Sequence, residues 1–355
     1  MEIGILTQGY VRRDGDTHSR IREVIAEARK ADEVGLASFA VSEQHFKFPT
    51  NSTGPITAIM AAIAQCTEQI MITPGAVIVP FHHPLVVAEE WAGIDIISKG
   101  RLFFGAGKGN TPLTADTFKV PIKESGAIAE EALEVIVKAW TQDKFAHEGK
   151  YFRIPEISVT PKPVQKPHPR IGFGTTSVEG ATWVGSRQLG LMTGATCHSW
   201  GEVESFVKAY DAAWKTGAPM PHATPEYRKS FLVHGHVARD FNAVKEELRE
   251  GLMQYVNRAV DYIRIWNERR GAPTPDYGAN LYNNFDAVID DMPTVFGTPD
   301  RAIEKLLRMK AMGFDRVDVC LDYAPHDEIL RCIELLGKEV APALKDSAPR
   351  ASSAA

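Results

Sequence analysis

The sequence predicts an α/β fold, a single (β/α)8 barrel of the TIM type with insertions. Apolar runs of strand length alternate with segments of helical periodicity about eight times along the chain. The stretch 70–110 contains a complete strand–helix–strand unit, and parallel strands joined by helices imply a barrel or a doubly wound sheet. With 355 residues, 44% of them hydrophobic, the chain can fill one large or two ordinary globular cores.

Composition and charge exclude several classes of protein. The net charge of −5, without a basic run, argues against a nucleic-acid partner. Four cysteines without C-x-x-C spacing are typical of a reduced, cytoplasmic protein. No apolar stretch is long enough to cross a membrane, and the N-terminus reads as a strand rather than a signal sequence. We expect one domain over 1–345 and a disordered Ala- and Ser-rich tail over 346–355.

The first two strand–helix units are predicted from short apolar runs and glycine stops. Apolar residues at helical spacing follow the first strand, and Gly35 ends that helix. The second strand ends at Val41 and is followed by Ser-Glu-Gln-His-Phe, at the barrel end where active sites are built. Glu43 and His45 there are either a satisfied polar pair or part of a site. The predicted elements are strands 2–8 and 36–41 and helices 21–35 and 55–65.

The stretch 70–110 is the clearest unit of the chain. It opens with a β-branched strand, begins a helix at Pro84 and ends that helix at Lys99-Gly100. A short strand over 101–104 then enters a glycine turn. A dinucleotide fingerprint would need glycine at position 110, where asparagine stands. We expect instead that Gly107 and Gly109 let backbone approach a ligand, while Lys108 offers a charge to a phosphate.

The middle of the chain contains a second candidate phosphate site. Thr175, Thr176 and Ser177 lie between a strand and a helix. A hydroxyl cluster there is either an N-cap or an anion site, because free backbone N–H groups and the helix dipole favour both. The four prolines of 161–169 predict an extended connector. The other predicted elements are helices 127–140 and 178–189, strand 171–174 and a hairpin over 145–152.

The last part of the chain continues the alternation. His234 and His236 share one face of a strand, as in metal-dependent hydrolase barrels, but the further ligands are missing and we expect no metal. Residues 269–292 are rich in Gly, Pro, Asn and Tyr, and we expect a mobile lid. The predicted elements are strands 191–195, 231–237 and 314–321 and helices 202–216, 243–266, 299 onward and 326–344.

The chain resembles the bacterial luciferase-like flavin monooxygenases from Met1 to about Leu344. The resemblance is carried by A-V-I-V-P-x-x-H-P, S-K-G-R and F-G-A-G-K-G within 76–109, and by H-E-G-K-Y-F, P-K-P-V-Q-K-P-H-P-x-I and G-T-P-D further on. It implies that the proline-rich connector is an internal crossing of one barrel rather than a domain linker.

The resemblance also implies a function. A separate reductase supplies reduced FMN, which reacts with O2 to form a hydroperoxide at the flavin C4a position and oxygenates a small organic substrate. We therefore expect an FMN-dependent monooxygenase, a transient reductase partner and a homodimer. Two alternatives stay open: a deazaflavin-dependent oxidoreductase that transfers hydride without oxygen, and a non-catalytic flavin-binding partner subunit.

The site residues follow from the same resemblance. The family pattern E-H-H-F is matched by Glu43, His45 and Phe46, while Gln44 replaces the histidine that is catalytic in luciferases. We expect His45 to transfer protons and Gln44 to orient flavin or substrate. His82 is either a turn residue or faces the pocket. The expected cofactor residues are Gly75 and Ala76, joined by a cis peptide under the flavin, with Gly107, Lys108, Gly109, Thr175, Thr176 and Ser177.

Overall fold

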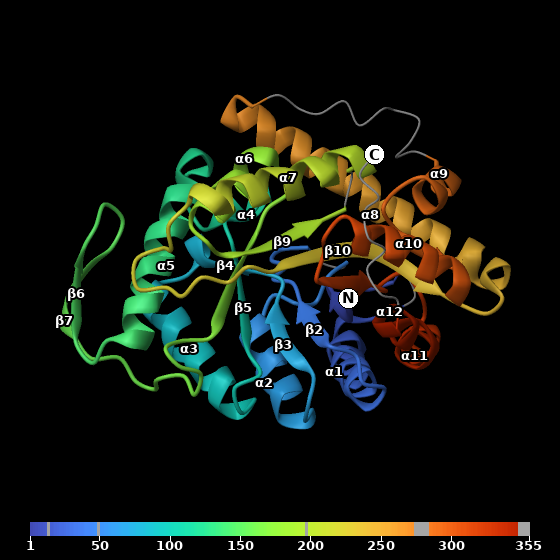
Figure 1. Ribbon diagram of the computed structural model, residues 1–355, viewed down its shortest axis with the longest axis horizontal. Coiled ribbons are helices and arrows are strands. Elements are labelled where there is room, and N and C mark those ends of the chain that lie inside the picture. The colour runs from blue at the N-terminus through green and yellow to red at the C-terminus, as the bar shows by residue number, and fades with distance from the viewer. Residues whose placement is uncertain (13–14, 48–49, 196–197, 273–283, 347–355) are drawn as a thin grey trace.

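The computed structural model describes residues 1–12, 15–47, 50–195, 198–272 and 284–346, which form a parallel β-barrel surrounded by helices (Figure 1). Only two residues separate β3 from β4, so these strands are two halves of one stave. A parallel bridge between Ile72 and Leu102 brings β3 beside β5 and closes the ring. Within the described residues the ring has eight staves, as predicted. Around the barrel they are β1 (Glu2–Thr7), β2 (Ser38–Val41), β3 (Met71–Pro74) with β4 (Val77–Ile78), β5 (Phe103–Gly107), β8 (Arg170–Gly174), β9 (Gly190–Gly194), β10 (Lys229–Val237) and β12 (Arg316–Cys320).

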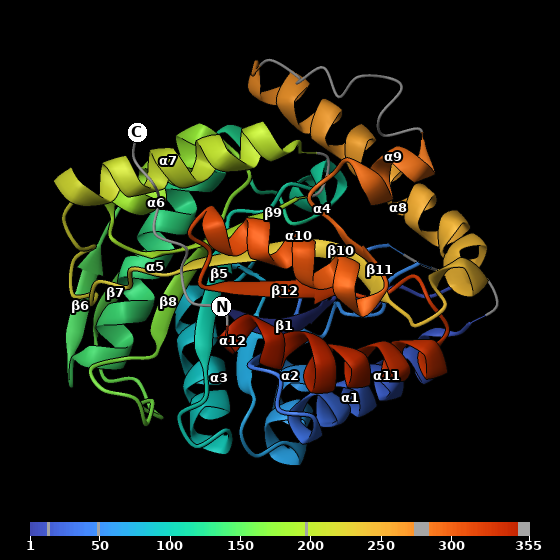
Figure 2. The same cartoon turned by 45° about the vertical axis from the view of Figure 1, so that its right-hand side comes forward.

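Helices cover the outside of the barrel and connect its strands (Figures 1 and 2). Asp16 begins the first of them, because its side chain accepts hydrogen bonds from the backbone N–H groups of His18 and Ser19. The helices are α1 (Thr17–Glu33), α2 (Ile56–Cys66), α3 (Pro84–Ile97), α5 (Ser125–Thr141), α6 (Val178–Ser186), α7 (Trp200–Thr216), α8 (Phe241–Arg270), α10 (Pro299–Ala311), α11 (His326–Leu335) and α12 (Ala341–Asp346), with the shorter α4 (Pro112–Thr117), α9 (Phe285–Asp290), η1 (Val79–Phe81), η2 (Ile122–Glu124) and η3 (Leu336–Val340).

Two short additions lie outside the alternation. The predicted hairpin is present as β6 (Phe145–Glu148) paired antiparallel with β7 (Arg153–Ile157). A short strand, β11 (Val295–Gly297), pairs with β10. The element labelled η3 continues the chain from α11 to α12, so the closing helix predicted over 326–344 is confirmed as one helical segment.

The glycine turn after the fourth stave was placed wrongly. Gly105, Ala106 and Gly107 belong to β5 and pair with β8, whereas the sequence predicted a strand that ends at Phe104. The reason is crowding inside the barrel, since a Cβ at Gly105 would lie 2.1 Å from the backbone oxygen of Pro74. Glycine therefore allows two strands to approach here, and the turn begins only at Lys108.

The segment before β11 also differs from the prediction. Helix α8 runs to Arg270, beyond the predicted end at 266, and α9 occupies part of the segment expected to be irregular. Residues 273–283 of the predicted lid, and 347–355 of the predicted tail, lie outside the described residues. No helix among those described is long and apolar enough to span a membrane. Of the cysteines in the described ranges, Cys66, Cys320 and Cys332 are free thiols.

Candidate active site

A cavity of about 520 Å3 lies at the carboxyl ends of the strands, between those ends and α8. Figure 2 shows α8 on the side to which the arrowhead of β12 points. The cavity is lined by all ten residues that the sequence singled out: Gln44, His45, Gly75, Ala76, Gly107, Lys108, Gly109, Thr175, Thr176 and Ser177. The fold therefore brings together residues from four staves that are far apart in the sequence.

One wall of the cavity consists of backbone and small side chains. The peptide between Gly75 and Ala76 is cis, which confirms that prediction. Gly107 pairs with Ile78 of the neighbouring strand, and a Cβ at Gly107 would lie 3.3 Å from the Cβ of Ala76. Gly109 has a φ of +79°, a conformation that favours glycine.

A second part of the cavity wall, where β5 and β8 end, is polar and partly cationic. Lys108 and the hydroxyls of Thr175, Thr176 and Ser177 line this part of the cavity. Ser177 is the N-cap of α6, because its Oγ accepts a hydrogen bond from the backbone N–H of Gly180 at 3.0 Å. The capping interpretation is thus confirmed, and it coexists with a place in the cavity wall. The anion-site interpretation relied on free backbone N–H groups, but the N–H of Thr175 is not free. It donates to the Met192 carbonyl oxygen at 2.9 Å.

A carboxylate and two imidazoles meet at the end of β2. Glu43 Oε1 lies 2.5 Å from His45 Nε2 and 2.7 Å from His82 Nε2. Glu43 Oε2 accepts a hydrogen bond from the backbone N–H of Ile78 at 2.8 Å. The side chain of Glu43 is fully buried, while those of His45 and His82 are 16% and 32% exposed. His82, left open by the sequence, therefore joins Glu43 and His45 in one cluster.

The contacts within the cluster shift the pKa values of Glu43 and His82. Burial alone would raise the pKa of Glu43, but hydrogen bonds from His45, His82 and the Ile78 backbone outweigh it and lower this pKa to about 2. Burial opposes protonation of His82, yet its contact with Glu43 raises the pKa of His82. Glu43 is consequently ionised at neutral pH and only accepts hydrogen bonds.

Gln44 is anchored to its neighbours. Its Nε2 donates to Ser42 Oγ at 2.8 Å and to Gln8 Oε1 at 3.1 Å. Its Oε1 accepts a hydrogen bond from Lys47 Nζ. Both ends of the amide are thus engaged, so Gln44 shapes the rim of the cavity and positions Lys47. A direct role toward a ligand remains a prediction.

Sequence reasoning missed the wall that α8 contributes. The residues of α8 that line the cavity recur at helical spacing. One of them, Tyr262, has its ring centroid 5.2 Å from the ammonium nitrogen of Lys47. The signal that could have revealed this wall is the run of aromatic residues at helical spacing within a helix otherwise rich in charge. The residues of the wall are Tyr255, Ala259, Tyr262, Ile263 and Trp266.

Aromatic rings surround His45 at the rim. Phe118 lies 5.2 Å from the His45 ring, Phe46 lies 5.7 Å from it and Phe81 lies 6.4 Å from it, as measured between centroids. Phe46 is 51% exposed and Phe118 38%, which is unusual for large apolar side chains. The rim therefore offers apolar surface next to the predicted proton-transfer residue.

The strand pair His234 and His236 lies in the interior of the protein. Both are buried, and burial lowers the pKa of each to about 4, so both are neutral at pH 7. His234 Nδ1 lies 3.0 Å from the Tyr323 hydroxyl. Among the described residues, Glu43, His45 and His82 form a group of three side chains of the types that can bind a metal. One nitrogen or oxygen atom from each lies within 4.8 Å of the others. The expectation of no metal stays a prediction.

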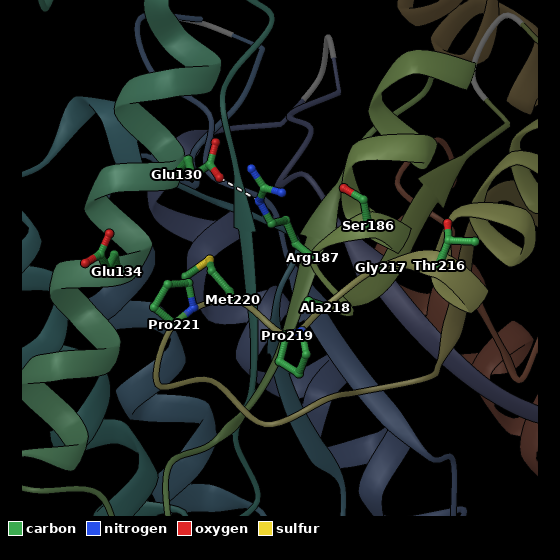
Figure 3. Close-up of a pocket in the computed structure, with 10 residues that line it drawn as sticks. All are labelled: Glu130, Glu134, Ser186, Arg187, Thr216, Gly217, Ala218, Pro219, Met220 and Pro221. Carbon is green, nitrogen blue, oxygen red and sulfur yellow. Dashed lines mark hydrogen bonds and ion pairs between the residues drawn. The ribbon is translucent and has the colours of Figure 1, made fainter.

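A second cavity of about 480 Å3 lies on the outside of the barrel, between α5, α6 and the segment after α7 (Figure 3). Arg187 crosses it and donates from Nε to Glu130 Oε1 at 2.7 Å. Trp183 Nε1 donates to the same carboxylate at 3.3 Å. None of the residues predicted for the site lies here, and its charged groups are already paired.

The comparisons with known proteins agree with this geometry. The luciferase-like monooxygenase family profile matches residues 1–316. Limonene 1,2-monooxygenase of Rhodococcus erythropolis is 26% identical over 96% of this chain and 86% of its own length. The oxygenase component of flavin-dependent trigonelline monooxygenase from Acinetobacter baylyi is 26% identical over 92% of this chain and 90% of its own.

Two further likenesses are to a solved structure and to a dehydrogenase. The oxygenating constituent of 3,6-diketocamphane monooxygenase from Pseudomonas putida, a type II Baeyer–Villiger monooxygenase solved with FMN, has a TM-score of 0.76 at 21% identity and covers 96% of this chain and 98% of its own. F420-dependent glucose-6-phosphate dehydrogenase of Gordonia bronchialis is 24% identical over 91% of this chain and 94% of its own. The family profile spans most of the chain, and the chain belongs to the luciferase-like monooxygenase family.

Proposed function

We propose that this chain is the oxygenase of a two-component system. It takes reduced FMN from a separate flavin reductase and uses O2 to oxygenate a small organic substrate. The observation that carries the proposal is the convergence of all ten predicted residues on one cavity at the barrel mouth. Relatives described as an oxygenase component and an oxygenating constituent support the reductase partner.

The residues of the cavity fit FMN. Its volume of about 520 Å3 falls within the range of roughly 300–1,000 Å3 typical of ligand pockets. Lys108 and the hydroxyls at the start of α6 suit a phosphate, for which a cation and a helix N-terminus are favourable. Gly107 lacks a Cβ, which would project beside Ala76 in the cavity wall. Glu179 also lines this end, but it is exposed, so its charge is screened.

Each part of the site then has a role. Lys108, Thr175, Thr176 and Ser177 bind the phosphate, while Gly75 and Ala76 support the ring. When bound, reduced FMN supplies the chemistry of oxygen activation. The aromatic wall of α8 excludes water, which reactive intermediates require. His45 moves the proton, because an imidazole nitrogen can accept and release a proton whereas the Gln44 amide cannot. The apolar rings beside His45 favour an apolar part of the substrate.

The test combines binding and isotope transfer. Reduced FMN is titrated into the protein without oxygen, and the complex is then mixed with 18O2 and with limonene or trigonelline as probes. We expect saturable binding of reduced FMN and, with an accepted substrate, one 18O atom in each product molecule. Absence of reduced-FMN binding at millimolar concentration contradicts the proposal. Light scattering of the purified protein tests the proposed homodimer.

Deazaflavin-dependent hydride transfer is the second candidate. The F420-dependent relative covers 91% of the chain, close to the 96% and 92% of the two monooxygenases, and this observation favours the second candidate. The same titration with reduced and oxidised F420, without oxygen, separates the two functions, because only the second candidate reduces or oxidises its substrate anaerobically. A non-catalytic partner subunit would bind reduced FMN and yet oxygenate no substrate when it is assayed alone.

A further inference from the structure

The Glu43 carboxylate is shared between two imidazoles through one oxygen. Both short contacts of Oε1 are made by an Nε2 atom, that of His45 at 2.5 Å and that of His82 at 2.7 Å. An ionised carboxylate only accepts hydrogen bonds, so each of these nitrogens must carry a proton. The second oxygen is held by the backbone N–H of Ile78 at 2.8 Å, which prevents the carboxylate from rotating. Three donors from three segments thus fix one buried anion.

The consequence for His45 is a defined tautomer. In the neutral ring the proton lies on Nε2, and Nδ1 holds the lone pair that can accept a proton. In the part of the chain that the structure describes, Nδ1 of His45 has no hydrogen-bond partner. Gly54 lies beside this nitrogen, where a Cβ would be 3.7 Å from Nδ1, an ordinary van der Waals distance.

We propose that Glu43 is a positioning residue, which holds His45 with its proton on Nε2 so that Nδ1 is the atom that accepts and releases protons. When Nδ1 accepts a proton, the ring becomes an imidazolium whose Nε2–H remains on the Glu43 carboxylate, and no other bond changes. When Nδ1 releases it, the original tautomer returns. The part that concerns turnover rests on the proposed function; the tautomer itself does not.

His82 has a different part in the cluster. It is twice as exposed as His45, at 32% against 16%, and it reaches Glu43 from the segment that precedes α3. Because it donates to the same oxygen, it neutralises part of the buried charge without touching His45 Nδ1. Removing His82 leaves the hydrogen bond between Glu43 and His45 in place. Substitution of His82 and substitution of Glu43 should therefore have different effects on His45.

The first experiment measures the tautomer directly. Protein with 15N-labelled histidine is examined by two-bond 1H–15N correlation NMR, and His45 is assigned by comparison with His45→Asn. We expect the Nε2–H tautomer in the wild type and in His82→Asn, and a mixture of tautomers in Glu43→Gln. A wild-type His45 protonated on Nδ1, or an unchanged tautomer in Glu43→Gln, overturns the proposal.

A matched control lies outside the cavity. Glu131 Oε1 is 3.3 Å from Nε2 of His147, and neither residue lines the cavity. Glu131→Gln should therefore alter the signals of His147 and leave those of His45 unchanged. A shift of His45 signals in this variant, as large as that in Glu43→Gln, would mean that neutralising any glutamate disturbs the ring and would overturn the assignment.

The second experiment tests turnover with a double-mutant cycle. General acid–base assistance is worth about 10²–10⁴ in rate, so Glu43→Gln should lower turnover by about 10-fold or more but by less than His45→Ala. Because Glu43 acts through His45, the double variant should match His45→Ala within about twofold. If the loss of turnover in the double variant equals the product of the two single losses, the positioning role is overturned. If the wild type binds no reduced FMN and oxygenates nothing, the proposed function fails, while the tautomer still decides the proposal.

Discussion

Arg20 holds two buried carboxylates at the end of the barrel that carries the cavity. It is 5% exposed and donates from Nη1 and Nη2 to Glu27 at 2.6 and 3.0 Å and from Nη2 to Asp322 at 3.2 Å. Asp322 in turn accepts a hydrogen bond from the backbone N–H of Gln8 at 2.6 Å, and Gln8 lines the cavity. The ion cluster therefore joins α1 to the strand ends that support the site.

Arg20→Met removes the charge and keeps most of the volume. Asp322, 3% exposed, is then left as a buried carboxylate without a counter-charge, and Glu27, 1% exposed, keeps only His326, whose Nδ1 lies 3.0 Å from its Oε1. Breaking a buried pair in this way costs about 3–5 kcal/mol, so we expect the free energy of unfolding to fall by that amount. The control is Arg264→Met, which removes an exposed contact with Glu268 at 3.0 Å and should change stability by about 1 kcal/mol or less.

The measurement is urea unfolding of both variants at pH 7 and pH 5. Burial would raise the pKa of Glu27, but Arg20 outweighs it and lowers that pKa in the wild type, so this contribution to stability is present above the unfolded value of about 4.3 and is lost as pH falls through the folded pKa. In Arg20→Met burial is opposed at Glu27 only by His326, so the deficit should be largest at neutral pH and smaller at pH 5. A loss at pH 7 no larger than that of Arg264→Met refutes the reasoning.

The remaining predictions concern the cavity and the barrel. Lys108→Ala should weaken FMN binding by about 10-fold or more, the loss of one charge-assisted hydrogen bond, and riboflavin binding much less; equal losses in a titration would remove the phosphate assignment. His45→Ala should lower oxygenation by about 10²–10⁴ and raise peroxide release with FMN affinity little changed, whereas wild-type rate and coupling would make His45 structural. Gln44→His should keep or improve proton transfer, and a loss of rate to the level of His45→Ala would contradict this. Gly105→Ala should lower the melting temperature, because its Cβ would lie 2.1 Å from the Pro74 oxygen; an unchanged melting temperature would show that the strands can separate there.

The barrel was predictable because its signals are local. Strand-length apolar runs, helical periodicity and stops such as Lys99-Gly100 can each be recognised within about ten residues. The order of these elements then implies a parallel barrel, in which the carboxyl ends of all strands meet at one face. The family resemblance assigned Lys108 and the hydroxyls of 175–177 to one phosphate site, and in the structure all four residues line the same cavity.

The boundaries failed where tertiary contacts override local pattern. Gly105 and Gly107 read as a turn, but both pair with β8 as part of β5, and a Cβ at Gly105 would lie 2.1 Å from the Pro74 backbone oxygen. Helix α8 runs beyond its predicted end, and its aromatic face packs over the barrel mouth. Propensity alone gives no account of such a face, since its stability comes from the surface that it covers.

The sequence by itself determined the kind of fold, the end of the barrel that carries the site and the chemical types of its residues, because these depend on periodicity and strand order. Only the tertiary structure decided how the polar groups share their protons. Glu43 and His82 are 39 positions apart, and their 2.7 Å contact exists only because adjacent staves are paired in one register. A hydrogen bond depends on distances of tenths of an ångström, and closure of the ring, rather than any local pattern, sets distances on that scale.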